Sequence, residues 1–440
     1  MAYFWPTALG FILQQGYAIV DSIVVGRFLG KGALAAIGGT NLTVLNLVII
    51  MFGGLSTGPM VVISQQLGKG QKDQVSCTIK NSMLLSLVVG FVITALILPF
   101  AKSIHIWMKT PRDILSDSVT YIRWYLIGIV PMLVFNMGSS IFRAVGQANK
   151  PLVYLVVCTI VNLILDIVFV IILGLGIRGA AAASALAQFV SAVMVVINLT
   201  KLKDGMNLKL DYRLSSYKMD RVLVFKILHI GFPSAIQNAL YFISGLLLSY
   251  CINLLGTDVV ATWAIFYKFD SLFWAISSAF NISVTNVSGM FYGAGDTSSL
   301  RYCASSGILC YMAVTFPFCA AMILTRGISP VLFSSDISVI SEASKILLYM
   351  GLSYPMFMLT EILGSIMKGT GLTIKPTIIT FITICLTRIV LVFAMALRHT
   401  TSFTIALCSF IPWTFSSLVF LVYYLSGKWM GKSLMGKNEH

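Results

Sequence analysis

Long apolar stretches separated by short polar breaks run through the whole chain. A helix that crosses a bilayer needs about 20 mostly apolar residues, and twelve stretches meet that length. They cover residues 3–28, 35–63, 77–100, 118–142, 152–174, 179–200, 228–254, 259–290, 302–325, 339–366, 377–397 and 402–426. Because lipid offers no hydrogen-bond partners, each stretch must satisfy its backbone internally. The pattern therefore predicts an all-α polytopic membrane protein with twelve transmembrane helices.

Composition and charge distribution fit this prediction. The 440 residues are 58% hydrophobic and 10% charged, whereas soluble domains carry about 25% charged residues. The net charge of +15 does not indicate a nucleic-acid partner, because the basic residues lie in loops and at helix ends. The loops and helix ends after even-numbered stretches hold 18 Lys and Arg, and the loops and helix ends after odd-numbered stretches hold 10. The positive-inside rule then predicts a multi-pass protein of the cell membrane with both termini in the cytoplasm.

The chain divides into two halves that resemble each other. The predicted units are an N-terminal six-helix lobe (1–200), a cytoplasmic linker (201–227), a C-terminal six-helix lobe (228–426) and a cytoplasmic tail (427–440). Lys150-Pro151 matches Lys375-Pro376, and four such matches keep an offset of 224 to 227 residues. An even number of spans per half makes these parallel repeats, hence two pseudo-symmetric bundles with a central cleft. This architecture favours alternating access over a channel, and we expect a monomer in the lipid bilayer.

Four polar residues of the N-terminal lobe fall at one predicted depth. With a rise of 1.5 Å per residue, Asp21 lies roughly 25 Å along its helix, Asp166 roughly 22 Å, and Ser184 roughly 8 Å below the outer end of its helix. Asn162 is one turn from Asp166 on the same helix face. Their oxygens suit a hard cation such as Na⁺, and two nearby carboxylates also suit proton carriage. The alternative is that each acid only pairs locally at a helix end.

Four charged residues lie inside the predicted helices of the C-terminal lobe: Lys268, Asp270, Glu361 and Arg388. Charges at the centre of a span cost about 2.5–3.5 kcal/mol each, so they persist when paired or useful. We expect a polar network of opposite charges here, with contact to substrate as the alternative.

Other motifs suggest packing rather than chemistry. Gly174 to Gly179 fits GxGxxG but joins two spans instead of following a strand, which excludes a dinucleotide site. Gly54 and Gly58 have the spacing that lets two helices approach closely. The eight Cys contain no CxxC pair and the four His are scattered, so neither predicts a metal site. The loops also lack the acidic or histidine clusters of a membrane enzyme.

The first predicted helix carries a family resemblance. The run from Leu13 to Gly30, together with Asn162-xxx-Asp166, the start of the sixth helix at Gly179 to Ser184, and Lys268-Phe-Asp270, resembles the multidrug and toxic compound extrusion family. The resemblance covers essentially the whole chain. It implies cation-coupled export of small organic, often cationic, compounds, with H⁺ or Na⁺ as the coupling ion and no other cofactor.

The resemblance also assigns residues. It implies that Asp21, Asn162 and Asp166 belong to a cation site in the N-terminal lobe, to which Ser184 brings a hydroxyl where the family often has Thr. One branch has a Glu eight residues after the proline of the seventh helix, where this chain has Tyr241. This difference favours the DinF-like branch. The alternative function is a flippase for a lipid-linked precursor or oligosaccharide, although few cations lie inside the spans.

Overall fold

The computed structural model describes residues 3–206, 219–396 and 401–430, and within them every regular element is a helix. Eleven helices are long and apolar enough to cross a membrane, and a bent pair, α6 and α7, makes twelve. This confirms the predicted all-α, polytopic fold. The chain forms two compact units, which meet in sequence at Gly231 and Phe232.

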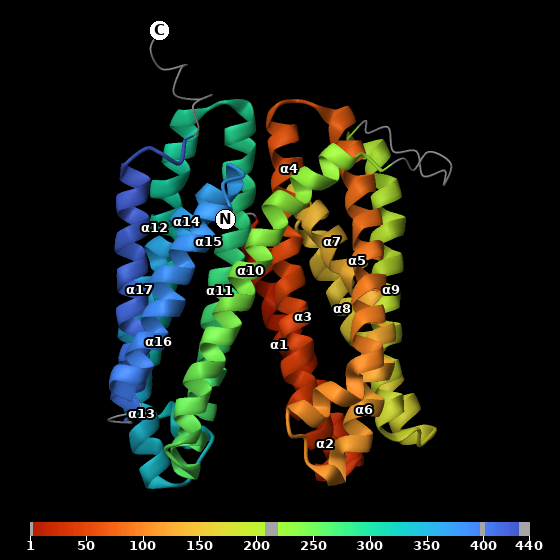
Figure 1. The fold of residues 1–440 in the computed structure, drawn as a ribbon, viewed down its shortest axis with the longest axis vertical. Coiled ribbons are helices and arrows are strands. Elements are labelled where there is room, and N and C mark those ends of the chain that lie inside the picture. Colours follow the sequence, from red (N-terminus) through yellow and green to blue (C-terminus); the bar gives the residue numbers. More distant parts are fainter. Residues whose placement is uncertain (1–2, 207–218, 397–400, 431–440) are drawn as a thin grey trace. The chain divides into compact units, whose positions relative to one another are not determined.

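The first unit contains the helices coloured red to yellow-green in Figure 1. They are α1 (Phe4–Phe28), α2 (Gly30–Ala36), η1 (Ile37–Asn41), α3 (Leu42–Leu55), α4 (Thr57–Gly68), α5 (Lys72–Trp107), α6 (Arg112–Ile127), α7 (Ile129–Ala144), α8 (Asn149–Asp166), η2 (Ile167–Ile172) and α9 (Gly176–Met206). The helix α10 (Arg221–Asn253) begins in this unit and continues into the second.

The second unit contains the remaining helices, coloured green to blue in Figure 1. They are α11 (Thr257–Ala294), α12 (Thr297–Leu324), η4 (Ser329–Leu332), α13 (Ile337–Ser353), η5 (Tyr354–Phe357), α14 (Met358–Gly369), α15 (Ile374–Thr380), η6 (Phe381–Leu386), α16 (Thr387–Leu391), η7 (Val392–Ala396) and α17 (Ser402–Leu425). The segments η1, η2, η6 and η7 are π-helical turns inside longer helices.

Three predicted spans are interrupted, and the first of them, 35–63, breaks at η1 and again between α3 and α4. The stretch at 118–142 is two helices that bend by 48° at Gly128. Pro131 follows closely, and it lacks the N–H that would bond back to the preceding turn. A Cβ on Gly128 would lie 2.8 Å from the Cα of Ala185, so only glycine permits this contact with α9. In the second unit, Pro355 sits in the 3₁₀ turn η5 that separates α13 from α14.

The helices extend beyond the limits that hydropathy predicts. The stretch predicted at 77–100 is helical from Lys72 to Trp107. Helices also run into the predicted linker, because α9 continues to Met206 and α10 starts at Arg221. The reason is that backbone hydrogen bonding continues into water after the apolar run ends. Residues 207–218 of the linker and 431–440 of the tail lie outside the described residues.

The first turns of α10 pack tightly onto the first unit. A Cβ on Gly58 would lie 2.3 Å from the carbonyl oxygen of Ile227, and a Cβ on Gly231 would lie 2.5 Å from that of Leu55. The spacing of Gly54 and Gly58 therefore does mark a close helix contact, made by Gly58 in α4 with α10. Just before α10, Asp220 donates its backbone N–H to Asn81 Oδ1 on α5 at 2.9 Å.

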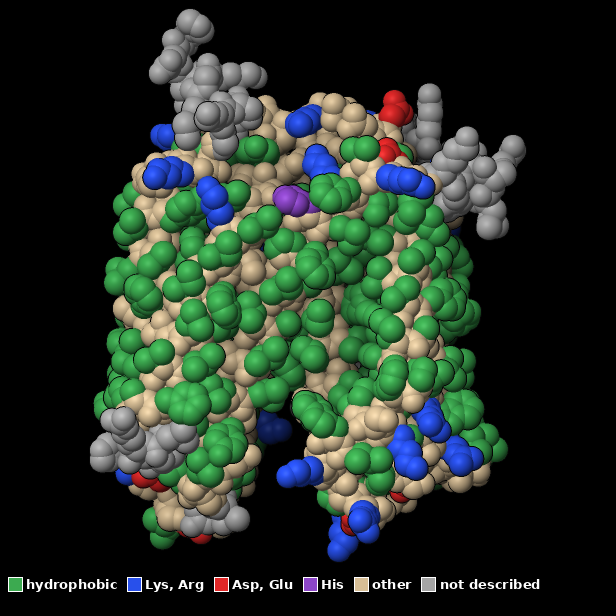
Figure 2. Space-filling model, in the orientation of Figure 1, with side chains coloured by type: hydrophobic (Ala, Val, Ile, Leu, Met, Phe, Trp, Pro, Cys, Tyr) green, Lys and Arg blue, Asp and Glu red, His purple; other side chains and the backbone are tan. Residues whose placement is uncertain are grey.

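The outward faces of the helices are apolar, as contact with lipid requires. On α5, Phe91, Leu96 and Phe100 each expose more than 60% of their surface. Figure 2 shows apolar side chains over the middle of the helices and Lys and Arg gathered near their ends. This distribution agrees with the composition and with the predicted depth of the spans.

Candidate functional site

The acids predicted for the first unit lie where α1 and α9 pack against α8. Asp21 is on α1, Asn162 and Asp166 are on α8, and Ser184 is on α9. Asp21 exposes 8% of its surface, Asp166 none, and Asn162 and Ser184 1% each. All four polar side chains are thus removed from lipid and water.

The two carboxyl groups face each other. Asp21 and Asp166 lie within hydrogen-bonding range, and their charges act on each other. Within the described part of the chain, no donor reaches Oδ1 of Asp21 or either carboxyl oxygen of Asp166. Because an ionised carboxylate only accepts hydrogen bonds, the pair can share one only when one group carries a proton. A single proton would therefore allow a hydrogen bond between the two carboxyl groups.

The neighbours of this acid pair are uncharged. Asn162 Nδ2 donates to Ser184 Oγ at 3.4 Å, which leaves the amide oxygen of Asn162 as a possible ligand. Tyr125 on α6 also lies in electrostatic range of Asp21. Sequence analysis missed Tyr125, because nothing in its helix distinguishes a tyrosine that faces the acid from one that faces lipid. The depth estimate brought the acids together correctly, but their role as a cation site stays a prediction.

Asp270 and Arg388 in the second unit are held by uncharged partners. Tyr354 donates its hydroxyl to Asp270 Oδ1 at 2.8 Å, and Trp274 donates to the same carboxyl group. Arg388, which exposes 5% of its surface, donates from Nε to the carbonyl oxygen of Cys408 at 3.0 Å and from Nη1 to Ser244 Oγ at 2.9 Å. These bonds satisfy both charges without a direct ion pair between them.

Glu361 belongs to a separate cluster. Its carboxylate accepts hydrogen bonds from Asn281 and Ser277 on α11 and interacts with the charge of Lys368, two turns further along α14. Glu361 and Lys368 expose 9% and 6% of their surfaces. Lys268 is exposed, and among the described residues no ion pair joins the four charged residues that the sequence singles out. The expected network of opposite charges is thus two separate clusters, and Lys368 was missed.

Aromatic rings pack around Asp270. Tyr354 stacks on Phe273 with ring centroids 3.7 Å apart and planes 17° apart, and Trp413 lies 5.9 Å from Tyr354. Trp274 lies edge-on to Trp413 at 6.3 Å. The tyrosine that holds Asp270 is therefore itself locked by packing, which fixes the direction of the carboxyl group.

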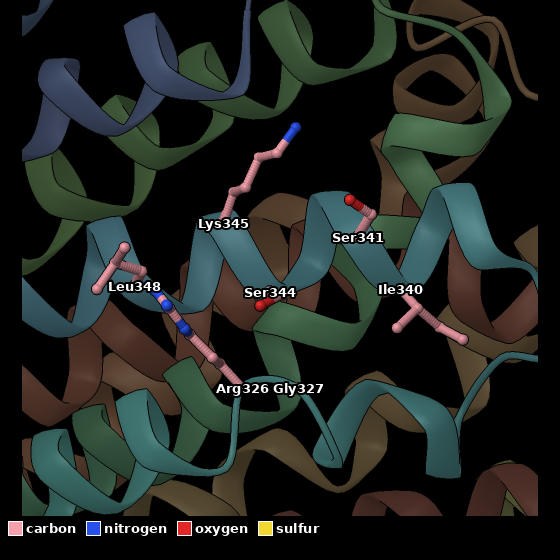
Figure 3. Close-up of a pocket in the computed structure, with 7 residues that line it drawn as sticks. All are labelled: Arg326, Gly327, Ile340, Ser341, Ser344, Lys345 and Leu348. Carbon is pink, nitrogen blue, oxygen red and sulfur yellow. The ribbon is translucent and has the colours of Figure 1, made fainter.

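A pocket of the second unit lies away from both groups of residues. It is formed by the turn after α12 and the early turns of α13, and Figure 3 shows the residues that line it: Arg326, Gly327, Ile340, Ser341, Ser344, Lys345 and Leu348. Lys345 is paired with Glu342 at 2.7 Å. None of the residues predicted for cation coupling or substrate contact lines this pocket.

The internal repeat decides the family. The MatE family profile matches the chain twice, over residues 6–168 and 233–394, one match in each half. The chain belongs to the MatE family. MatE proteins are membrane transporters rather than enzymes, and the two matches confirm the repeat that the sequence showed.

Relatives match this MatE chain over nearly its whole length. A probable multidrug resistance protein, NorM, of Thermotoga maritima is 25% identical over 97% of this chain and 92% of its own. The probable multidrug resistance protein YoeA of Bacillus subtilis is 24% identical over 98% and 93%. These matches do not separate branches of the family, so the DinF-like assignment stays a prediction.

Solved structures confirm the fold. A crystal structure of MATE in a bent conformation is 22% identical with a TM-score of 0.89, over 98% of this chain and 95% of that one. A MOP superfamily transporter from Pyrococcus furiosus is 23% identical with a TM-score of 0.87, over 97% and 94%.

Proposed function

We propose that this MatE protein exports small organic compounds, cationic or amphipathic, in exchange for H⁺ or Na⁺ by alternating access between its two lobes. The names of its relatives support export of drugs. In addition to NorM and YoeA, the multidrug export protein MepA of Staphylococcus haemolyticus is 23% identical over 85% of this chain. None of these names supports the alternative of a flippase for a lipid-linked precursor.

The observation that carries the proposal is the pair formed by Asp21 and Asp166. Two carboxyl groups that face each other in a buried site repel when both are ionised, because burial disfavours charge and like charges add to the cost. Binding one proton removes the repulsion and supplies a shared hydrogen bond. A cation therefore changes the packing energy between α1 and α8, which is the differential interaction that a conformational change requires.

H⁺ is the ion that this geometry favours. A proton needs only the two carboxyl groups, whereas a metal ion needs a fuller set of oxygen ligands. Na⁺ would have to be bound by Asp21, Asp166, the amide oxygen of Asn162 and the hydroxyl of Ser184, which is the alternative to test.

The transport cycle follows from this pair. An organic compound enters from the cytoplasm while the acids are ionised, and H⁺ from outside then neutralises the pair and favours the state that releases the compound outward. We place both termini in the cytoplasm and the protein, as a monomer, in the cell membrane. Lys268, Asp270, Glu361 and Arg388 are the proposed contacts of the compound in the second lobe or the residues that shape its surroundings.

The test is dye efflux by the full chain in inside-out vesicles, with the proton and sodium gradients collapsed separately. Asp21→Asn and Asp166→Asn keep the shape of each side chain but cannot carry a proton. Both are expected to reduce efflux to the rate of vesicles without the protein. Asp117→Asn is the matched control, because Asp117 is exposed on α6 of the same lobe. Full efflux by the Asp21 and Asp166 variants, with Asp117→Asn also active, would refute the proposal.

A further inference from the structure

A second buried titratable group lies in the first unit, at the end of α5. His105 has no exposed surface and reaches η1, the π-helical turn between α2 and α3. Its Nδ1 lies 2.7 Å from the carbonyl oxygen of Ala101, and its Nε2 lies 3.1 Å from Asn41 Oδ1. The amide nitrogen of Asn41 donates to the carbonyl oxygens of Ala36 and Ser118, both at 2.9 Å.

These contacts fix the number of protons that the cluster needs. A carbonyl oxygen only accepts, so His105 Nδ1 must donate to Ala101. Because Asn41 Nδ2 already donates to two carbonyl oxygens, Oδ1 is the atom that faces His105 Nε2. An amide oxygen also only accepts, so Nε2 must donate as well. Neutral imidazole has one N–H, and imidazolium has two.

Turning the amide of Asn41 does not remove the need for the second proton. The turned amide would donate to a neutral Nε2, but its oxygen would then face the carbonyl oxygens of Ala36 and Ser118. Acceptor would meet acceptor at two contacts instead of one. The cluster contains four acceptor oxygens, namely Asn41 Oδ1 and the carbonyl oxygens of Ala36, Ala101 and Ser118. The amide of Asn41 supplies two N–H donors, so His105 must supply the other two, which only imidazolium can do.

We propose that His105 is a second proton-binding site, whose occupancy holds η1 against α5 and α6. When Nε2 loses its proton, its lone pair faces Asn41 Oδ1, and the hydrogen bond that joins α5 to η1 becomes a repulsive contact. The chain at η1 is already broken, since Gly39 has non-helical angles of φ −79° and ψ −118°. A nearby contact, Thr40 Oγ1 to Thr110 Oγ1 at 2.7 Å, would remain as the other link.

No buried counter-charge accompanies His105 on the elements packed against it. The charged residues of α2, of α6 and of the last turns of α5 are all exposed: Lys31, Lys102, Arg112, Asp113, Asp117 and Arg123. The remaining charged residues of α5, Lys72, Asp73 and Lys80, lie in its first turns, at the opposite end of the helix. The other titratable groups on α2, on α6 and at this end of α5 are Tyr121, which is buried, and Tyr125, which is half-buried. Protonation of His105 is thus set by its two acceptors rather than by an ion pair.

The position of His105 in the lobe suggests a role for it in transport, and this role rests on the proposed function. The predicted topology puts His105 at the outer end of the lobe, on the side that supplies protons. The turn η1 follows α1 through the short helix α2, and Asp21 lies about 10 Å before the end of α1. A proton on His105 would hold the outer part of the lobe in place while the acid pair exchanges its cation.

The first test is ¹⁵N NMR of the full chain in nanodiscs, with labelled histidine. His105→Gln identifies the signal, and the exposed His229 serves as an internal reference. At pH 6, both ring nitrogens of His105 are expected to carry a proton, because both face acceptor oxygens. Asn41→Leu removes one acceptor and should make His105 neutral at the same pH. A neutral wild-type His105, or a charged one in Asn41→Leu, would overturn the proposal.

The second test is hydrogen–deuterium exchange of residues 37–41, corrected for the chemical exchange rate. Exchange should be about fivefold faster at pH 9 than at pH 6, as expected for the loss of one hydrogen bond. In His105→Gln this difference should disappear, and a wild-type difference that persists there would count against the site. Efflux by Asp21→Asn tests the proposed function separately, since neither measurement on His105 depends on transport.

Discussion

Replacing Gly58 with alanine would place a methyl group inside the backbone of α10. The new Cβ would lie 2.3 Å from the carbonyl oxygen of Ile227 and 3.1 Å from its carbonyl carbon, whereas ordinary contact begins near 3.4 Å. These neighbours are backbone atoms, so no side-chain rotation can relieve the overlap. The two helices must separate by about 1 Å, and overpacking of this kind costs about 1–3 kcal/mol. We expect the upper end of that range.

The matched control is Gly53→Ala, five positions earlier in α3. A Cβ there meets nothing within 4 Å, so the change tests helix propensity alone, which favours alanine by about 1 kcal/mol. Thermal unfolding of the purified protein in detergent can be followed with a thiol-reactive dye, because five free cysteines are buried in the fold. Gly58→Ala should melt clearly below the wild type and Gly53→Ala at or above it. Equal melting temperatures for the two variants would refute the packing argument.

Two further predictions concern groups held by hydrogen bonds. Hydrogen bonds from Ser299, the side-chain bond first and then the backbone bond, lower the pKa of Asp296 to about 2 from an ordinary 3.8. The Asp296 carboxylate therefore stabilises the start of α12 above pH 4, and this stabilisation is lost as the pH falls towards 2. Any difference in melting temperature between the wild type and Asp296→Asn should therefore change between pH 5 and 3 and stay constant above pH 5. Arg388→Lys keeps the charge but cannot keep both hydrogen bonds of the guanidinium, so it should reduce the free energy of unfolding by about 2 kcal/mol. The same melting assay checks it, with Arg301→Lys, a change at an exposed arginine of the same unit, as a control that should not shift the melting temperature.

Hydropathy was sufficient for the number of spans, because length and apolar content are what the bilayer selects. It could not find the bend at Gly128, although Pro131 was a local signal. It also misplaced helix ends such as Lys72 and Trp107 by several residues, since helices continue past the lipid boundary.

The candidate site was only partly accessible from sequence. Depth along the helix brought Asp21 and Asp166 to one level, and the structure places them together. Depth says nothing about which way a helix is rotated, so it could not show that Asp270 is held by the hydroxyl of Tyr354 and meets the charge of Arg388 only at longer range. Its partner Tyr354 comes from the interrupted span α13–η5–α14, and a contact across two spans depends on how the helices pack against one another.

One pair of π-helical turns repeats between the two lobes. The turn η2 starts at Ile167, directly after Asp166, and η7 starts at Val392, which is 225 residues later and so in register with the repeat. Such turns arise when one residue is inserted into an α-helix, and they are rare. A rare feature at equivalent points of both halves is an independent mark of the repeat, whereas η1 and η6 have no such counterpart.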